Sequence, residues 1–477
     1  MNVIKGIIHD LPLSNVIISK LTYQGMDELE DLYTKFSYPY VEVRRHSINN
    51  RIIHFLNGNP VGGFFEKETG YSLRFFQGTL YFSSSKNPKE LGSKTYPIHG
   101  WEQGFSSENP EGGKYEVKER KGFDSVSLED KTEVFLDAYK RVKVIPQLKN
   151  LSVTYIESLE EKEILVNGVK VSGRVPRIGI FISAVIKEGD RSATARFELG
   201  KSGGLEVLEE SNLPEFVEEK IKEVLKVLQK GRSFGEKRTD VVLSNMLSGI
   251  MAHESVGHPF EADRIAGREF AQAGTSYLSV LKGDKIGSEA VNVIDDPTIP
   301  GSYGFYLIDD EGVLGRPKYL IKEGKKNELL TDRFSANRIG TTSNGSARAS
   351  SFDREPLVRM SNTFFKPGNL TFDELVEDVK EGVFIKSYME WNIDDMRLGE
   401  RYVGLEAYEI RDGEVQDPVI FPVLEGKTTD LLSSVDAVDN TLEFYPGTCG
   451  KGDPDQGVPV WLGGPNMRFR NVKVKVM

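Results

Sequence analysis

Cysteine is almost absent from this sequence: Cys449 is the only one among 477 residues. No intramolecular disulfide can therefore form, and one thiol remains that is structural, reactive or a metal ligand. The chain also lacks any run of about eighteen apolar residues, which argues against a membrane-spanning helix. Its N-terminus mixes Lys5, His9, Asp10 and Pro12 with apolar residues and has no signal-peptide organisation. We therefore expect a cytoplasmic protein.

A surplus of basic charge is missing as well. Lys and Arg number 61 against 72 Asp and Glu, so the formal net charge is −11. A nucleic-acid surface built from bulk charge is therefore not expected, although a local basic patch stays open. The hydrophobic and charged fractions, 38% and 28%, are those of an ordinary soluble protein, and the length allows two or three domains.

The pattern of apolar residues predicts an α+β fold. We expect an N-terminal α+β domain over residues 1–232, with antiparallel sheets, flanking helices and a possible subdivision near residue 148. A β-rich domain over residues 233–477 should carry the helix with the densest ligand cluster. The boundary follows the clearest helix, residues 211–230, which has Pro214 in its first turn and ends before Gly231.

Local signals place the other elements. A polar turn at Asn49-Asn50 should join strands at 40–47 and 51–57, and Asn167-Gly168 should form a tight hairpin turn. Strand breaks are expected at Gly62, Gly63, Gly70 and Gly78. Helices are expected at 26–36, after Ser127, after Ser244 and at 371–380.

The densest group of possible metal ligands is His253-Glu254-Ser-Val-Gly-His258. Imidazole is a good zinc ligand, and a carboxylate can take a proton from metal-activated water. The familiar pattern, H-E-x-x-H, is one residue shorter. In a regular helix each residue advances by roughly 100°, so residues five apart point about 140° away from each other. Because Gly257 and Pro259 flank His258, we expect the helix to end or bulge near Gly257 and let His258 swing back toward His253.

Alternatives stay open for these residues. A His-Glu pair on a helix is more often packing and surface than catalysis. Burying both groups at the polar end of an apolar helix would be costly without a partner, which a metal would supply. A catalytic zinc site usually has three protein ligands. Cys449, in the glycine-rich segment 446–457, is the candidate third ligand, and the alternative is a small buried hydrophobe. The remaining histidines are interpreted as surface or sheet residues: His9, His46, His54 and His99.

Motifs along nearly the whole chain resemble the TldD branch of the TldD/PmbA metalloproteases. They are His253-Glu-Ser-Val-Gly-His258 with Glu261 and Asp263, Asp309-Asp-Glu-Gly312, Arg348-Ala-Ser, Arg359-Met-Ser-Asn-Thr363, Cys449-Gly-Lys, Val458-Pro-Val460 and Val41-Glu-Val-Arg-Arg-His-Ser-Ile-Asn-Asn-Arg51. The resemblance implies a zinc-type site with His253, His258 and Cys449 as ligands and Glu254 as general base. Relatives without the histidines form a non-catalytic PmbA or TldE branch, whereas this chain keeps all four residues.

Two hypotheses follow from the resemblance. The first is a metal-dependent peptidase acting on unfolded or short peptides, with Zn²⁺ or Fe²⁺, since both accept imidazole and thiolate. The second is a non-catalytic binding or regulatory protein with a structural metal, in line with the family's older description as a modulator of DNA gyrase. The family forms dimers, so a homodimer or a heterodimer with a metal-less relative is expected.

Three acidic features are left with two interpretations each. Glu261 and Asp263 either orient the ligand histidines from behind or are simply exposed after the helix. The segment Asp309 to Gly312 is expected to be a turn, and the family pattern suggests a contact with substrate.

Overall fold

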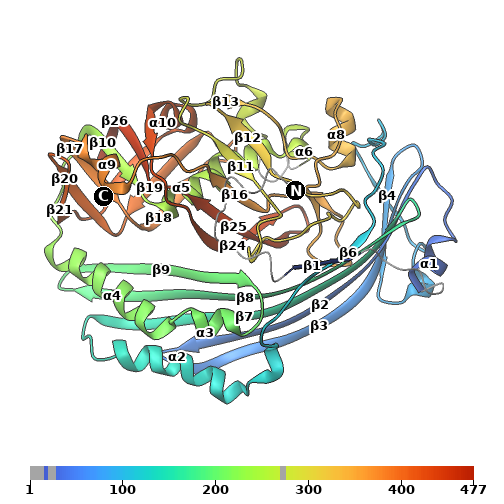
Figure 1. Cartoon of the computed structure of the whole chain (residues 1–477), viewed down its shortest axis with the longest axis horizontal. Coiled ribbons are helices and arrows are strands. Elements are labelled where there is room, and N and C mark those ends of the chain that lie inside the picture. The colour runs from blue at the N-terminus through green and yellow to red at the C-terminus, as the bar shows by residue number, and fades with distance from the viewer. Residues whose placement is uncertain (1–15, 20–27, 269–274) are drawn as a thin grey trace.

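The computed structural model describes residues 16–19, 28–268 and 275–477 (Figure 1). The fold is α+β, as predicted. A long curved sheet lies below in this view, and the β-rich C-terminal half packs above it. None of the described helices is both long and apolar enough to cross a membrane.

The N-terminal half forms one sheet in the order β1-β6-β8-β7-β2-β3-β4-β5, with β9 paired to β8. Helices α2, α3 and α4 lie on its lower face (Figure 1). The elements are β1 (Val16–Ser19), α1 (Glu28–Tyr33), β2 (Tyr40–Leu56), β3 (Asn59–Phe76), β4 (Leu80–Ser85), η3 (Pro88–Glu90), β5 (Tyr96–Ile98), β6 (Gly113–Val117), η4 (Phe123–Ser125), α2 (Leu128–Val142), β7 (Leu148–Val166), β8 (Val169–Glu188), β9 (Arg191–Ser202), α3 (Glu206–Glu210) and α4 (Leu213–Lys230).

The hairpin turns of this sheet correct one expectation and confirm another. Strand β2 continues through Asn49-Asn50, and the chain reverses at Asn57 and Gly58, whose φ angles are 51° and 78°. A tight hairpin turn needs two left-handed residues, which Asn followed by Gly adopts more easily than Asn followed by Asn. Asn167 and Gly168 form the expected turn, with φ angles of 46° and 80°. Strand β3 also runs on through three of the expected break points, Gly62, Gly63 and Gly70.

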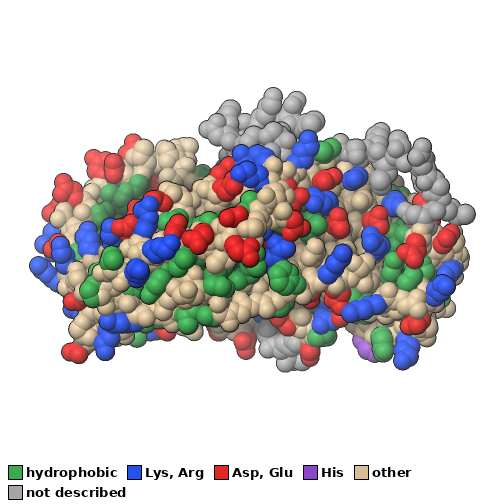
Figure 2. Space-filling view, turned by 90° about the horizontal axis from the view of Figure 1, so that it is seen from below, with side chains coloured by type: hydrophobic (Ala, Val, Ile, Leu, Met, Phe, Trp, Pro, Cys, Tyr) green, Lys and Arg blue, Asp and Glu red, His purple; other side chains and the backbone are tan. Residues whose placement is uncertain are grey.

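The lower face of the molecule carries charges of both signs. Lys and Arg side chains are interspersed there with Asp and Glu, and hydrophobic side chains lie between them (Figure 2). Over the atoms coloured in this view there is no continuous basic stripe of the kind that follows a nucleic-acid backbone.

The chain crosses to the C-terminal half between the end of α4 at Lys230 and the start of β10 at Lys237. Strands on both sides of residue 148 belong to the same N-terminal sheet, since β7 pairs with β2 from Ser152 to Val166. The expected division into domains at residues 232 and 233 stays a prediction.

The C-terminal half holds a nine-stranded and a six-stranded sheet. Their orders are β18-β19-β22-β26-β10-β17-β20-β21, with β23 on β26, and β13-β12-β11-β16-β25-β24. The strands are β10 (Lys237–Leu243), β11 (Val293–Asp295), β12 (Lys318–Lys322), β13 (Lys325–Lys326), β14 (Ala347–Arg348), β15 (Leu357–Val358), β16 (Asn362–Phe365), β17 (Glu381–Ile385), β18 (Tyr388–Ile393), β19 (Gly399–Gly404), β20 (Ala407–Arg411), β21 (Glu414–Pro418), β22 (Pro422–Lys427), β23 (Val435–Val438), β24 (Glu443–Lys451), β25 (Gln456–Gly464) and β26 (Met467–Val476).

Short helices join these strands. They are α5 (Asn245–Met251), α6 (Ala262–Ile265), η7 (Tyr277–Ser279), α8 (Arg333–Ile339), α9 (Phe372–Glu377) and α10 (Thr428–Ser434). The helix expected at 371–380 is α9. Helices α8 and α10 were missed because seven residues are too few to establish a helical period.

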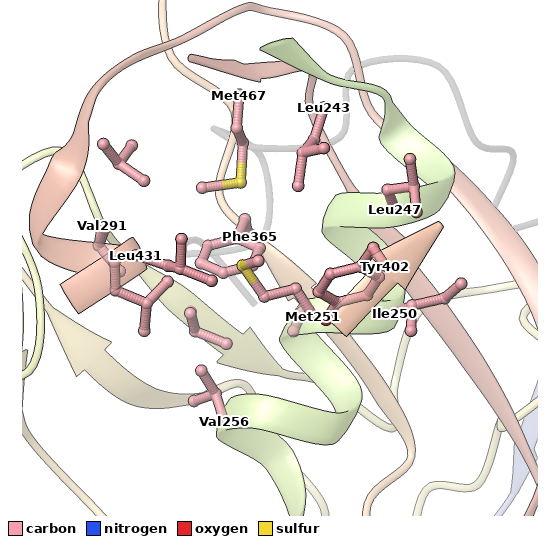
Figure 3. Packing of buried hydrophobic residues seen from close by; sticks show 14 of the residues in the cluster. Leu243, Leu247, Ile250, Met251, Val256, Val291, Phe365, Tyr402, Leu431 and Met467 are labelled. Atoms are coloured by element: carbon pink, nitrogen blue, oxygen red, sulfur yellow. The ribbon is translucent and has the colours of Figure 1, made fainter. Parts of the chain in front are cut away.

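Helix α5 runs through the main C-terminal core. Leu247, Ile250 and Met251 on the helix pack among side chains from both C-terminal sheets, including Phe365 and Tyr402 (Figure 3). The helix follows directly from β10, so its direction is set by the centre of the nine-stranded sheet. Residues that continue α5 are therefore held rigidly.

Buried ion pairs join the two halves of the chain at the turn Asp309–Gly312. Oδ2 of Asp310 lies 3.3 Å from Nη1 of Arg44 and 3.0 Å from Nζ of Lys162, both on the N-terminal sheet. The segment is a turn, as expected, and the three acidic residues of the turn are no more than 3% exposed. Asp310 and Glu311 pair with cations of the sheet, whereas the carboxylate of Asp309 accepts the N–H groups of Glu311, Val313 and Ala347.

Candidate metal centre

The helix that carries the motif changes its winding at the motif. After α5 ends at Met251, Ala252–Gly257 (η5) form a π-helix, and His258–Phe260 (η6) form a 3-10 turn. The N–H of His258 donates to the carbonyl of His253, five residues earlier. A turn closed by that bond brings residues five apart to one side of the helix, which a regular helix cannot do.

The position of the distortion corrects the expectation from sequence. We expected His253 and Glu254 on regular helix, with the break near Gly257. Instead the widened turn spans all three residues, and the backbone stays helical at Gly257, with φ −53° and ψ −62°, and at His258, with φ −58° and ψ −44°. Pro259 lies within the following 3-10 turn, where its missing N–H costs little.

Substituting Gly257 should destabilise the widened turn. A Cβ atom at this position would lie 1.8 Å from Sδ of the fully buried Met360. An Ala for Gly exchange in a helix ordinarily stabilises by about 1 kcal/mol. For Gly257→Ala we expect instead a loss of about 1–3 kcal/mol in the free energy of unfolding, because the core must shift. Denaturant unfolding measures this, with Gly62→Ala as the control, since a Cβ there meets nothing within 4 Å. A Gly257→Ala protein as stable as the parent would contradict it.

Three candidate ligands converge at this turn. Donor atoms of His253, His258 and Cys449 lie within 4.8 Å of one another, and the three residues are 3 to 5% exposed. Sγ of Cys449 is 3.5 Å from Nε2 of His258, and the two imidazole rings are 5.0 Å apart at 80°. The structure thus brings together the residues that the sequence singled out. Of the other histidines, His46 and His54 lie on β2 and His99 follows β5, whereas His9 is outside the described residues.

Cys449 reaches the site from a strand, although the sequence suggested a loop. It lies in β24, which pairs with β25 so that Cys449 faces Val458. Glycine and proline are poor strand formers, but β24 is at the edge of its sheet, where Pro446 needs no partner on one side. The strand gives the thiol a fixed position.

The donor set fits a divalent cation of the zinc type. Zinc bonds of about 2.0 Å to nitrogen and 2.3 Å to sulfur at a tetrahedral angle place the two donors roughly 3.5 Å apart, which matches the 3.5 Å between Cys449 and His258. Nδ1 of His253 is buried without a hydrogen-bond partner in the structure. Buried polar atoms rarely stay unpaired, so this nitrogen of His253 still lacks the electropositive partner that such an atom usually has.

The electrostatics of the group favour a thiolate. Burial opposes ionisation of Cys449, but His258, Arg359 and His253 outweigh it and hold the pKa of the thiol well below its ordinary value. Burial likewise opposes protonation of His258, while Cys449 and Glu261 raise its pKa to about 9. The thiolate is the form that binds metals. Cys449 is therefore already in its metal-binding form, and a bound cation would replace the proton on His258.

Glu261 and Asp263 are buried behind the histidines, so the interpretation as exposed residues is wrong. They are 0% and 1% exposed. Oε2 of Glu261 lies 3.1 Å from Nδ1 of His258, which leaves Nε2 of that ring facing the thiol. Nζ of Lys451 links the two carboxylates, at 3.1 Å from Glu261 and 2.7 Å from Asp263. A carboxylate on the far nitrogen of a ligand histidine fixes its orientation.

The sequence did not reveal the cations that hold this group. Arg359 is fully buried and donates to the carbonyl of Cys449 and, at 2.8 Å, to that of Gln456. Lys451 shares a strand face with Cys449 because alternate residues of a strand point the same way. That spacing would have indicated Lys451 had the strand been recognised. Arg359 stood in one of the motifs that resemble the family, but nothing in the sequence indicated that it contacts the strand of Cys449.

The buried carboxylate of Glu400 is hydrogen-bonded to a side chain of the widened turn. Oε2 of Glu400 accepts hydrogen bonds from Ser255 and, at 2.8 Å, from Tyr402. Burial raises the pKa of Glu400 to about 7, although both hydroxyls act to lower it. Glu400 is therefore one of the groups through which pH should act on the stability of this region.

The stability of the parent protein should fall as pH rises from about 4.5 to 7. In that interval folded Glu400 keeps a proton that the unfolded chain releases, so ionisation penalises the folded state by up to about 3 kcal/mol above pH 7. We expect Glu400→Gln, which cannot ionise, to be more stable than the parent at pH 8 and similar at pH 4.5. Thermal melting across this range measures the difference, with Glu409→Gln as a control on another strand of the same sheet. Parallel profiles for parent and Glu400→Gln would rule the effect out.

Taken together, the α+β fold of several sheets and a buried His-His-Cys group beside a carboxylate define a metallopeptidase-type protein. Residues 236–476 match the model of the PmbA/TldA metallopeptidase C-terminal domain, and residues 121–229 match that of the central domain. The chain belongs to the PmbA/TldD metallopeptidase family.

Individual relatives of this chain are consistent with the family assignment. A metalloprotease of Methanothermobacter thermautotrophicus is 32% identical over 86% of this chain and 89% of its own length. A zinc metalloprotease TldD homolog of Saccharolobus solfataricus is 28% identical over 69% of this chain and 72% of its own. Among solved structures, TldE from Thermococcus kodakarensis has a TM-score of 0.69 at 16% identity, over 94% of this chain and 100% of that one, and so shares the fold.

Proposed function

We propose that this chain is a metal-dependent peptidase of the active TldD branch, which hydrolyses unfolded or short peptides. The observation that carries the proposal is the convergence of His253, His258 and Cys449 within 4.8 Å. Glu254 follows one of these candidate ligands directly in the chain and is 9% exposed. The family relation to metalloproteases supports the same reaction class.

Each residue of the site has a separate role in the proposed hydrolysis. The two imidazoles and the thiolate would hold a cation, and when bound it would supply a Lewis acid for the peptide carbonyl and for water. Glu254 accepts a proton from the attacking water and delivers it to the nitrogen of the leaving amine. Glu261 holds His258 in the orientation for binding, and Arg359 holds the strand that carries Cys449.

The edge position of β24 supports an extended peptide as substrate. Among the described strands β24 pairs only with β25, so its other edge belongs to no ladder, although the carbonyl of Cys449 already accepts a hydrogen bond from Arg359. An extended peptide can add to such an edge as a further strand, whereas a folded protein cannot present its backbone in this way. We therefore include a preference for unfolded or short peptides in the proposal.

Metal analysis combined with a cleavage assay tests the proposal. Purified protein should contain about one Zn²⁺ or Fe²⁺ per candidate site and cleave an unstructured peptide. A chelator should abolish cleavage, and the correct cation should restore it. Metal-loaded protein that melts at a higher temperature but cleaves no peptide would instead favour a structural metal in a regulatory protein. That outcome would agree with the likeness, in fold, to a Thermotoga maritima protein proposed to modulate DNA gyrase, with a TM-score of 0.72 at 16% identity over 91% of this chain and 96% of that one.

We also propose a cytoplasmic location and a dimer, formed either by two copies of this chain or with a metal-less relative. Mass measurement of the purified chain, alone and mixed with such a relative, distinguishes the two assemblies.

A further inference from the structure

Arg397 reaches the candidate base from a distant hairpin. Its Nη1 contacts Oε2 of Glu254, and the two side chains are only 19% and 12% exposed. Glu254 makes no ion pair with any other residue in the described part of the chain. Nε of Arg397 is buried without a hydrogen-bond partner there, so no second acceptor competes through that atom. The contact is therefore specific to these two side chains.

The loop that presents Arg397 is strongly organised. It joins β18 to β19, and Arg397 has a left-handed backbone with φ 62°. The carboxylate of Asp394 accepts the N–H groups of Leu398 and Gly399 at 2.9 and 2.7 Å. Oγ1 of Thr428 donates to the carbonyl of Arg397 at 3.0 Å. These bonds fix the backbone from which the guanidinium extends.

The same loop is tied to the segment that follows the metal-binding motif. Nη2 of Arg264 donates to the carbonyl of Asp395 at 2.7 Å. The N–H of Tyr277 donates to the carbonyl of Met396 at 2.9 Å. The hydroxyl of Tyr277 also donates to the carbonyl of Ser255 at 3.1 Å, within the widened turn. Hydrogen bonds thus connect the loop that carries Arg397 to the widened turn that carries Glu254.

We propose that Arg397 is a positioning residue for Glu254. Its guanidinium holds Oε2 and leaves Oε1 as the atom that receives the proton of the attacking water and passes it to the leaving nitrogen. Arg397 stays protonated throughout, because its guanidinium does not give up a proton in proteins. A base acts well only within hydrogen-bond reach of the proton it takes, so fixing the carboxylate raises the rate of the chemical step. The inference rests on the peptidase function proposed above.

The main test replaces the guanidinium without straining the loop. Arg397→Asn suits this, because Asn tolerates the left-handed backbone, and Arg397→Lys keeps the charge but loses the planar guanidinium that contacts Oε2 through Nη1. We expect Arg397→Asn to lower kcat about tenfold to a hundredfold, with KM and bound metal changed less than about threefold. Added guanidinium ion should restore part of the rate. Arg401→Asn, which removes an arginine paired with Glu390 on the adjacent strands, should keep parental kcat.

Two double-variant measurements distinguish positioning from simple support of the fold. In the metal-loaded protein, Glu254→Gln/Arg397→Asn should be no slower than Glu254→Gln alone, because Arg397 acts through Glu254. In the metal-free protein, the losses in melting temperature of the single variants should not add in the double variant, because each change already breaks the contact.

Three outcomes would overturn the proposal. They are parental kcat in Arg397→Asn, rate losses that multiply in the double variant, or a rate loss explained by lost metal. A parent protein that binds metal yet cleaves no peptide would overturn the proposed function as well. A parent that cleaves while Arg397→Asn keeps parental kcat would overturn only the positioning role.

Discussion

Glu254→Gln is expected to lower kcat for peptide hydrolysis by at least a hundredfold, to about ten-thousandfold, while bound metal stays near the parental amount. Glutamine keeps the size of the side chain but cannot accept the proton of the attacking water, and general-base catalysis contributes rate factors of this order. Glu254 is not one of the converging donors, so metal binding should persist. Steady-state kinetics on an unstructured peptide and metal analysis of the same sample measure both quantities.

The control for this experiment is Glu390→Gln, which changes an exposed carboxylate of the same half of the chain. It should cleave at the parental rate. Undiminished hydrolysis by metal-loaded Glu254→Gln would exclude Glu254 as the base. Loss of metal from Glu254→Gln would show that the carboxylate takes part in binding the cation.

Cys449→Ala should weaken metal binding by more than about 100-fold and abolish cleavage. Changes to residues that only support a ligand typically cost 10- to 100-fold in affinity, and removing one of three ligands should exceed this. The thiolate also supplies the only negative charge among the three donors, so its loss removes attraction as well as a bond. Competition with a chelator of known affinity measures the change, and melting with and without chelator checks it independently.

Val458→Ala is the matched control for Cys449→Ala. Val458 lies opposite Cys449 on β25 and is 2% exposed, so the substitution disturbs the same buried region without removing a ligand. It should lower stability and keep the metal. Normal metal content in Cys449→Ala, with melting that still responds to chelator, would assign Cys449 to the core and require another third ligand.

Much of the candidate site could be predicted because its residue types are chemically distinctive. Two histidines and one cysteine are rare enough in this chain to be singled out. The extra residue in H-E-x-x-x-H correctly indicated a departure from regular helix. The form of that departure could not be predicted, because a widened turn is stabilised by packing, here the contact of Gly257 with Met360, which comes from a distant segment.

The supporting cations were harder to predict, since Arg and Lys are common and usually exposed. Arg359, Arg397 and Lys451 gain their roles only when strands and hairpins far apart in sequence meet. The overall fold class followed from strand and helix patterns, whereas strand lengths did not. A strand such as β2 passes through Asn49-Asn50 because pairing with β3 and β7 along both edges outweighs local turn preference.

The buried junction at the turn Asp309–Gly312 also constrains the order of events during synthesis. Arg44 is fully buried in the N-terminal sheet, yet its hydrogen bonds go to Asp310 and to the carbonyls of Ser351 and Arg354. While the ribosome is still making the middle of the chain, that guanidinium has none of these acceptors, and burying it would be costly. The guanidinium of Arg44 therefore stays in water on the N-terminal sheet until the segment up to Arg354, roughly three quarters of the protein, has been translated and packs over it.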